Sequence, residues 1–351
     1  MTTSYFRLGL IAAAPLLVAC ASNASTVAQA DADAGGPAPA PGACTPIAAE
    51  RTTVRVKSEL GTLEGTLDVP EGCGSVPVVL ILSGSGSTDR DGNAPGATAN
   101  PAIYRVLAEA LHDAGLATLR YDDEGIGQSV TAAPDKVEDF RFGMEVDDAA
   151  RFIAKLRDDA RFGPLVVAGH SQGSLTAIMA AKAQPIDGFI SLAGAGRPAG
   201  KLLHEQVAPR LTSGELDALD AAIASMERGV APGALPAPLD KILPAPEQPY
   251  LISWMRVDPK VEIAALSAPT LLIQGKLDTQ VQVLDANLLH DAKPDATLVL
   301  VDDMGHMLRR VTSKSSAAQN ASYTQPLPLH PAVGDAVARF VKTLVHRTTA
   351  E

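Results

Sequence analysis

The stretch Leu165-Val166-Val167-Ala168-Gly169-His170-Ser171-Gln172-Gly173-Ser174 connects an apolar, strand-like run to the start of a helical pattern. Its centre is Gly-x-Ser-x-Gly, which in this setting is typical of a sharp turn that exposes a nucleophilic serine. Glycine at positions 169 and 173 lets neighbouring backbone approach a strained Ser171 closely. The following helix offers free N–H groups to a developing negative charge. A chance Gly-Ser turn is the alternative, and the strand and helix context favours the nucleophile.

Strand-like and helix-like segments alternate on both sides of this turn. The strand-like runs are residues 76–82, 117–121, 165–168, 186–192, 270–274 and 297–301. Helical patterns lie between most of them, as expected of crossover connections. The pattern therefore predicts an α/β fold with a mostly parallel central sheet flanked by helices. Residues 53–56 and 63–69 alternate with period two and predict an antiparallel strand pair.

The alternation stops between about residues 197 and 257. Helix-like pieces at 201–207 and 213–228 are followed by a proline-rich stretch at 231–249. An insertion of this size between two core strands predicts a helical cap over an active site. Tyr250 and Trp254, with Met255, either line an acyl pocket beneath this cap or pack it against the core.

A serine hydroxyl is a weak nucleophile without a base, so a histidine is needed downstream of Ser171. His306 follows the last strand-like run, where a loop at the carboxyl end of the sheet can reach the serine. His330, just before the closing helical pattern, is the alternative base. The other downstream histidines lie in the cap, in a helical segment or near the C-terminus, and they are His204, His290 and His346.

The base needs an acid that holds its imidazole in the productive tautomer. Asp278 follows the run 270–274 by four residues, which puts it on the same rim of the sheet. We expect it to orient His306. The competing carboxylates are interpreted as solvated or capping groups, and they are Asp258, Asp285, Asp302 and Asp303.

The oxyanion formed during acyl transfer needs two N–H donors. One is the backbone of Gln172, directly after the nucleophile. The second is expected from the glycine-rich loop at 83–93, and we assign it to Ser85, with Gly86 as the neighbouring alternative. The Asp-Arg-Asp-Gly run in this loop is not a calcium loop, because the later ligands of such a loop are missing.

These residues resemble the α/β-hydrolase superfamily. The resemblance covers about residues 50–345 and includes the turn Arg120-Tyr121-Asp122-Asp123-Glu124-Gly125-Ile126-Gly127-Gln128-Ser129. The loop Gly84-Ser85-Gly86-Ser87-Thr88-Asp89-Arg90-Asp91-Gly92-Asn93 is similar to a group of capped bacterial serine esterases with a GSGxxDRDGN motif. Many relatives have His-Gly where Ser83-Gly84 stands here, which leaves the position of the second oxyanion donor open.

The resemblance implies hydrolysis of carboxylic esters through an acyl-enzyme, with Ser171, Asp278 and His306 as the triad and a small-molecule ester as substrate. Amide or peptide cleavage and acyl transfer use the same triad and stay open. The alternative from another class is a non-catalytic binding lipoprotein. No cofactor is expected, since a Gly-x-Gly-x-x-Ala match at 194–199 lacks the acidic partner of a dinucleotide site. No metal-ligand motif is visible.

Composition sets limits on partners. The 351 residues are 46% hydrophobic and 20% charged, which fits a packed core and argues against a disordered or fibrous chain. A net charge of −11 repels phosphate backbones, and only 4% of the residues are aromatic, so nucleic-acid binding is not expected. The oligomeric state is left open.

The N-terminal segment predicts export. Residues 1–19 read as a signal peptide whose end, Leu17-Val18-Ala19-Cys20, resembles a bacterial lipobox with lipidation at Cys20. Residues 20–46 are a disordered tether, and 47–351 form the folded domain. We expect a cell-envelope lipoprotein that faces the periplasm, attached to the membrane only by its lipid. A secretory signal cut near Ala19 or Ala21 would instead give a soluble periplasmic or secreted protein. In that oxidising compartment, Cys44 and Cys73 form a disulfide or stay as two free thiols.

Overall fold

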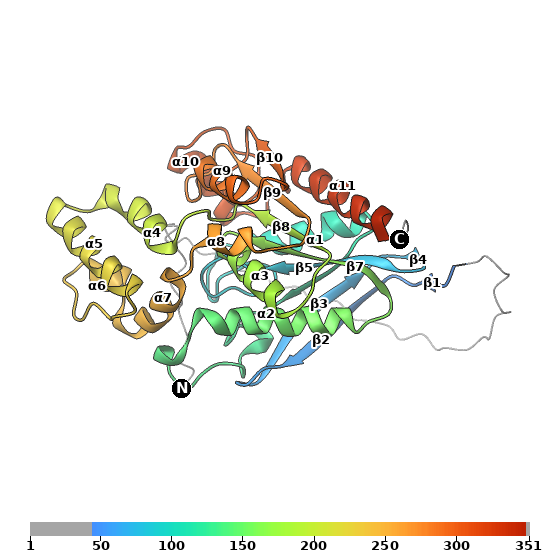
Figure 1. The fold of residues 1–351 in the computed structure, drawn as a ribbon, viewed down its shortest axis with the longest axis horizontal. Coiled ribbons are helices and arrows are strands. Elements are labelled where there is room, and N and C mark those ends of the chain that lie inside the picture. The colour runs from blue at the N-terminus through green and yellow to red at the C-terminus, as the bar shows by residue number, and fades with distance from the viewer. Residues whose placement is uncertain (1–43, 349–351) are drawn as a thin grey trace.

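An eight-stranded sheet organises the structure, a computed structural model that describes residues 44–348 (Figure 1). The strand order is β10-β9-β8-β7-β5-β6-β3-β2. The strands are β2 (Glu50–Lys57), β3 (Thr62–Val69), β5 (Val76–Leu82), β6 (Ala117–Tyr121), β7 (Phe162–His170), β8 (Gly188–Leu192), β9 (Thr270–Gly275) and β10 (Thr297–Val301). β2 pairs antiparallel with β3, and β3 with β6, whereas all other neighbours are parallel. The predicted mostly parallel sheet is therefore confirmed.

The central strand β5 is buried on both faces. Val78 and Leu80 point into one core layer, while Val79 and Ile81 point into the other. Side chains along a strand alternate between faces, so an uninterrupted apolar run suits a strand covered by helices on both sides. This burial explains why β5 lacks the polar alternation seen in β2.

Helices cover both faces of the sheet. On one side lie α2 (Phe142–Arg157), α3 (Gln172–Ala183), α8 (Pro259–Ala264) and α9 (Val283–Ala292), and on the other α1 (Ile103–Asp113) and α11 (Pro331–Thr348). In α1, Ile103, Leu107 and Leu111 follow helical spacing, and all three are buried against the sheet. The apolar stripe of α1 thus fixes which way the neighbouring Tyr104 faces.

A helical insertion separates β8 from β9. It contains α4 (Ala199–Val207), α5 (Ser213–Glu227), α6 (Leu239–Ile242) and α7 (Gln248–Met255), of which α4, α5 and α6 project beyond the sheet in Figure 1. Helix α7 packs against α2. The sequence indicated only a proline-rich stretch where α6 and the start of α7 lie. Proline is compatible with the first turn of a helix, and Pro249 occupies that turn of α7.

A short ribbon closes the N-terminal end of the described chain. β1 (Pro46–Ile47) pairs with β4 (Gly72–Cys73), and a disulfide joins Cys44 to Cys73, whose Cα atoms are 5.6 Å apart. A further helix, α10 (Ser316–Thr324), follows β10. Within residues 44–348, no helix has the length and apolar character needed to cross a membrane. The predicted signal peptide, the lipidation site Cys20 and most of the tether lie outside the described residues.

Candidate active site

Ser171 occupies a sharp turn between β7 and α3. Its backbone has φ 53° and ψ −119°, a conformation that non-glycine residues rarely adopt. The Ser171 N–H donates to the carbonyl of Leu192 on β8 at 2.9 Å, which holds the turn at the carboxyl end of the sheet. A Cβ at Gly169 would overlap the carbonyl of Gly173, and one at Gly173 would overlap the carbonyl of Ser83. Both glycines are therefore required for the turn to close.

Asp278 and His306 form a buried pair on the same rim. Asp278 lies just after β9, and His306 lies in the loop after β10. Their exposed fractions are 1% and 3%, and the distance from His306 Nδ1 to Asp278 Oδ2 is 2.8 Å. A carboxylate in this position accepts a hydrogen bond from the Nδ1–H group and leaves His306 Nε2 as a proton acceptor.

The second oxygen of Asp278 is also engaged. Oδ1 accepts hydrogen bonds from the backbone N–H groups of Gln280 at 2.8 Å and Val281 at 3.0 Å, and Gln274 Nε2 donates to Oδ2 at 3.2 Å. These donors prevent the Asp278 carboxylate from rotating away from His306.

His306 lies beside the residue that precedes Ser171. The rings of His170 and His306 have centroids 4.8 Å apart, and His170 Nε2 is 2.9 Å from the backbone oxygen of His306. The alternative base His330 instead pairs with Asp303, with Nε2 2.9 Å from Oδ1. Of these two histidines, His306 is the one whose ring contacts the turn.

The competing carboxylates have other partners. Asp258 caps α8, and Asp302 pairs with Lys276. Asp285 is fully buried, caps α9 and accepts two hydrogen bonds from Arg197. The capping role of Asp285 agrees with the interpretation from the sequence. Asp285 is not a solvated carboxylate, because it is buried and pairs with Arg197.

The glycine-rich loop 83–93 runs past the serine. A Cβ placed on Gly84 would lie 3.2 Å from Ser171 Cβ, so the loop backbone is almost in contact with the turn. Ser85 and Gly86 follow and are half-buried. The N–H groups expected to bind an oxyanion, those of Gln172 and Ser85, thus flank the serine from α3 and from this loop.

Carboxylates at the end of β6 hold the glycine-rich loop. Asp123 accepts from the Ser83 hydroxyl at 2.8 Å and from the Thr88 N–H at 2.9 Å. Asp122 accepts from Arg90 Nε at 3.0 Å and Nη2 at 2.6 Å. Within the Asp-Arg-Asp-Gly-Asn motif, Asp89 accepts hydrogen bonds from the backbone N–H groups of Asp91 and Asn93. The motif therefore fixes the shape of the loop.

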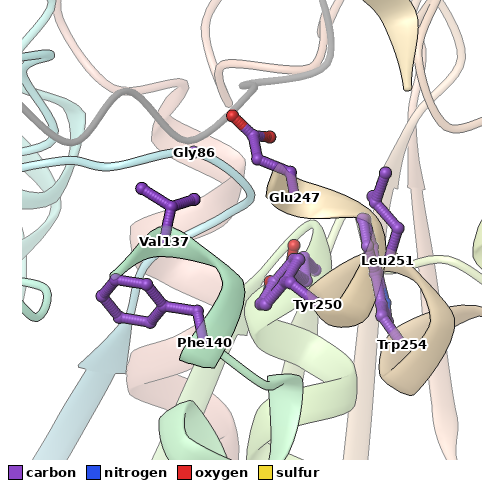
Figure 2. Close-up of a pocket in the computed structure, with 8 residues that line it drawn as sticks. Gly86, Val137, Phe140, Glu247, Tyr250, Leu251 and Trp254 are labelled. Carbon is purple, nitrogen blue, oxygen red and sulfur yellow. The ribbon is translucent and has the colours of Figure 1, made fainter. Parts of the chain in front are cut away.

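A pocket that is open to solvent lies between this loop, the segment 137–140 that precedes α2, the start of α3 and the insertion (Figure 2). Its lining residues are Gly86, Val137, Phe140, Gln172, Glu247, Tyr250, Leu251 and Trp254. Since Gln172 is one of the expected oxyanion donors and Gly86 follows the other, Ser85, the pocket opens beside Ser171. Tyr250 and Trp254 line it, whereas Met255 is buried in the core behind it.

Polar contacts fix the inner end of this pocket. Gln172 Nε2 donates to Glu145 Oε2 and to the Tyr250 hydroxyl, both at 2.6 Å, and that hydroxyl donates to Glu145 Oε1 at 2.9 Å. Helices α2, α3 and α7 are thus joined beside the serine. Glu145 was not predicted from the sequence, because its position in α2 carries no motif.

The residues described contain no cluster that fits a metal: no group of three or more His, Cys, Asp or Glu side chains in the range 44–348 could hold one. The glycines of the dinucleotide-like match are packed against protein. A Cβ on Gly194 would overlap the hydroxyls of Ser174 and Ser191, and the Gly196 N–H donates to Asp285. This turn therefore serves packing.

Comparisons with known proteins find a matching family model and similar sequences. Residues 94–229 match the family described as "Serine aminopeptidase, S33". Esterase EstD of Thermotoga maritima is 24% identical over 283 residues, which cover 80% of this chain and 65% of EstD. The match thus spans slightly less than two thirds of the length of that relative.

Solved structures share the fold. The Pyrococcus furiosus esterase Pf2001 superposes with a TM-score of 0.54 at 18% identity, covering 84% of this chain and 91% of that one. Est1E from Butyrivibrio proteoclasticus gives 0.54 at 17% identity, with 84% and 99% covered. The chain has the α/β-hydrolase fold, as the sequence predicted.

Proposed function

We propose that this protein is a serine hydrolase that cleaves carboxylic esters through an acyl-enzyme formed on Ser171. The observation that carries the proposal is the buried 2.8 Å contact between Asp278 and His306, beside a strained serine turn. The esterases among the proteins of similar sequence and fold support the same reaction class.

The proposed reaction has two halves. Ser171 Oγ attacks the ester carbonyl while His306 Nε2 takes the serine proton, and Asp278 stabilises the resulting imidazolium. The N–H groups of Gln172 and Ser85 bind the oxyanion of the tetrahedral intermediate. His306 then protonates the departing alcohol. Water then gives a proton to His306 and attacks the acyl carbon, the bond from that carbon to Ser171 Oγ breaks, and Oγ takes the proton back from His306 as the acid leaves.

The pocket lining supports a substrate with an apolar portion. Phe140, Leu251 and Trp254 offer apolar surface, and Gln172 and Tyr250 form its polar inner end. A small-molecule ester whose apolar group enters this pocket places its carbonyl beside Ser171. Ferulic acid is bound to Est1E in one of the solved structures of that esterase, so a protein of related fold binds an aromatic acid.

Steady-state hydrolysis of p-nitrophenyl esters of increasing acyl length tests the proposal. We expect turnover by the wild type and loss of at least about a thousandfold in His306→Gln. The matched control is His330→Gln, which removes the other buried histidine with a carboxylate partner and keeps turnover. Equal activity of both variants would overturn the choice of His306.

Peptide hydrolysis is the second candidate, and the match of residues 94–229 to a serine aminopeptidase family favours it. The same triad cleaves amides, so the leaving group separates the two candidates. Parallel assays with aminoacyl p-nitroanilides and the matching p-nitrophenyl esters measure the preference. We expect the ester to be cleaved with the higher kcat/KM relative to its uncatalysed rate; the reverse would establish a peptidase.

Attachment of the protein to the membrane is a separate proposal, and it is supported by the lipobox-like stretch Leu17-Val18-Ala19-Cys20. Lipidation of Cys20 would anchor the folded domain in the bacterial envelope, facing the periplasm. Fractionation of cells that express the full chain tests it. The wild type should sediment with membranes, and Cys20→Ser should move to another fraction; no difference would contradict lipidation.

A further inference from the structure

Tyr104 of α1 and His170 of β7 connect the glycine-rich loop 83–93 to the loop that carries His306. The backbone N–H of Gly84, in the glycine-rich loop, donates to the Tyr104 hydroxyl at 2.6 Å. That hydroxyl lies 3.1 Å from His170 Nδ1, and His170 Nε2 lies 2.9 Å from the backbone oxygen of His306. A continuous chain of hydrogen bonds therefore runs from the expected oxyanion loop to the expected base.

The direction of every bond in this chain is determined by its ends. A backbone N–H can only donate and a carbonyl can only accept. His170 must therefore carry its proton on Nε2, facing the His306 carbonyl, and use Nδ1 as an acceptor. The Tyr104 hydroxyl must accept from Gly84 and donate to His170. No proton in the chain can be moved without losing a bond.

Burial keeps the chain in this state. Tyr104 is 5% exposed and His170 is 3% exposed. Burial lowers the pKa of His170 to about 3, with the positive charge of a protonated His306 adding to the effect. Burial also raises the pKa of Tyr104 above its usual value. Both side chains are neutral across the working range of pH, so the bonds keep their direction throughout a catalytic cycle.

We propose that Tyr104 and His170 are positioning residues, which hold the Gly84–Ser85 backbone and the His306 backbone at fixed distances from Ser171. This inference rests on the proposed function. Gly84 is almost in contact with the serine, so releasing its N–H from Tyr104 lets the loop carrying the Ser85 donor shift. A small shift of a donor costs transition-state stabilisation. Ground-state binding is kept, because all residues that line the pocket except Gly86 lie outside this loop.

Tyr104→Phe tests the proposal, because it removes one oxygen and keeps the ring that packs in the core. We expect kcat for a p-nitrophenyl ester to fall about 10- to 100-fold, with KM within about twofold. Affinity for a trifluoromethyl ketone, which forms an oxyanion on the serine, should fall by a similar factor. The matched control is Tyr121→Phe, which removes a hydroxyl from another tyrosine that has no hydrogen bond to Gly84 or His170 and should leave both quantities unchanged.

His170→Gln is the second variant, because its side-chain amide can still donate to the His306 carbonyl. It should retain part of the activity and exceed His170→Leu in kcat. If Tyr104→Phe does not fold, the comparison of these two variants decides the matter.

The outcomes separate two failures. A folded wild type that neither turns over esters nor binds the ketone would overturn the proposed function. An active wild type with unchanged kcat and ketone affinity in Tyr104→Phe would overturn the positioning role, even if the variant melts at a lower temperature, since a lower melting temperature alone reports a structural contact.

Discussion

Asp278 and His306 stand 28 residues apart in the chain, and their side chains meet at 2.8 Å between Oδ2 and Nδ1. The contact forms because β9 and β10 are parallel neighbours, so the loops after both strands emerge at the same edge of the sheet. Ser171 reaches that edge from β7. The parallel pairing of β7, β8, β9 and β10 thus brings all three residues to one edge of the sheet.

Asp278→Asn should inactivate the enzyme without unfolding it. The Asn oxygen can keep the N–H groups of Gln280 and Val281, which leaves its NH2 group facing His306 Nδ1. The imidazole must then carry its proton on Nε2 and cannot accept one from Ser171. We expect kcat to fall about 10³- to 10⁴-fold, measured with a p-nitrophenyl ester.

Asp303→Asn is the control for this change, since Asp303 also contacts a histidine, His330. It should keep wild-type kcat. Activity of Asp278→Asn within tenfold of the wild type would show that another carboxylate orients the base.

Gly84→Ala should reduce turnover more than stability. The added Cβ would lie 3.2 Å from Ser171 Cβ and 3.4 Å from His170 Nδ1, distances that require the loop to move by a few tenths of an ångström. We expect kcat to fall about tenfold or more. Gly143→Ala is the matched control, because nothing lies within 4 Å of the added carbon, and helix α2 tolerates alanine. A Gly84→Ala enzyme with full kcat would show that the loop has room to spare.

Asp148→Asn should stabilise the protein increasingly as pH rises. Burial raises the pKa of Asp148 to about 8, and the nearby carboxylate of Glu124 adds to this shift. The folded state therefore binds a proton that the unfolded state releases above about pH 4, so the stability of the wild type falls as pH rises towards about 8. Asn resembles the protonated acid and avoids that loss. Melting temperatures between about pH 5 and pH 8 should diverge by a few degrees in favour of the variant.

Asp147→Asn supplies the control for this pH series, because Asp147 is the exposed neighbour of Asp148 on the same helix. Its melting temperature should follow the wild type at every pH. A constant offset between Asp148→Asn and the wild type would contradict protonation of Asp148 in the folded state.

Replacing both Cys44 and Cys73 with serine should lower the free energy of unfolding by about 3 kcal/mol, because the disulfide closes a long loop in the unfolded chain. Urea unfolding measures this change. The wild type with reductant should match the double variant, and reductant should not affect the double variant. The same midpoint for oxidised wild type and double variant would exclude a stabilising bridge.

The sequence predicts the strands of the main sheet well, because they depend on local patterns, but it misses some of their ends. β7 runs from Phe162 to His170, whereas the predicted run is 165–168. Continuous apolar runs mark β5 and β7, and the Gly-x-Ser-x-Gly turn places Ser171 between a strand and a helix. Asp278 and His306 could be chosen because parallel strands carry their following loops to one edge. The choice of Ser85 as a donor stays a prediction.

Contacts that depend on how helices pack were not predictable. Tyr104 and His170 are 66 residues apart, and their contact requires the rotation of α1 on the sheet. An apolar stripe through Ile103 and Leu107 gives that rotation only once the sheet is known. Glu145 meets Tyr250 across 105 residues for the same reason, through the packing of α7 on α2.

Labelling of the purified protein with a fluorophosphonate, followed by mass spectrometry of the adduct, shows whether Ser171 is an activated nucleophile. Only a serine activated by a base reacts rapidly with this probe. We predict one adduct, on Ser171, that is lost in Ser171→Ala and His306→Ala and kept in Ser174→Ala, with all variants folded by circular dichroism. A folded wild type that stays unlabelled, or an adduct that persists in Ser171→Ala, would contradict the account.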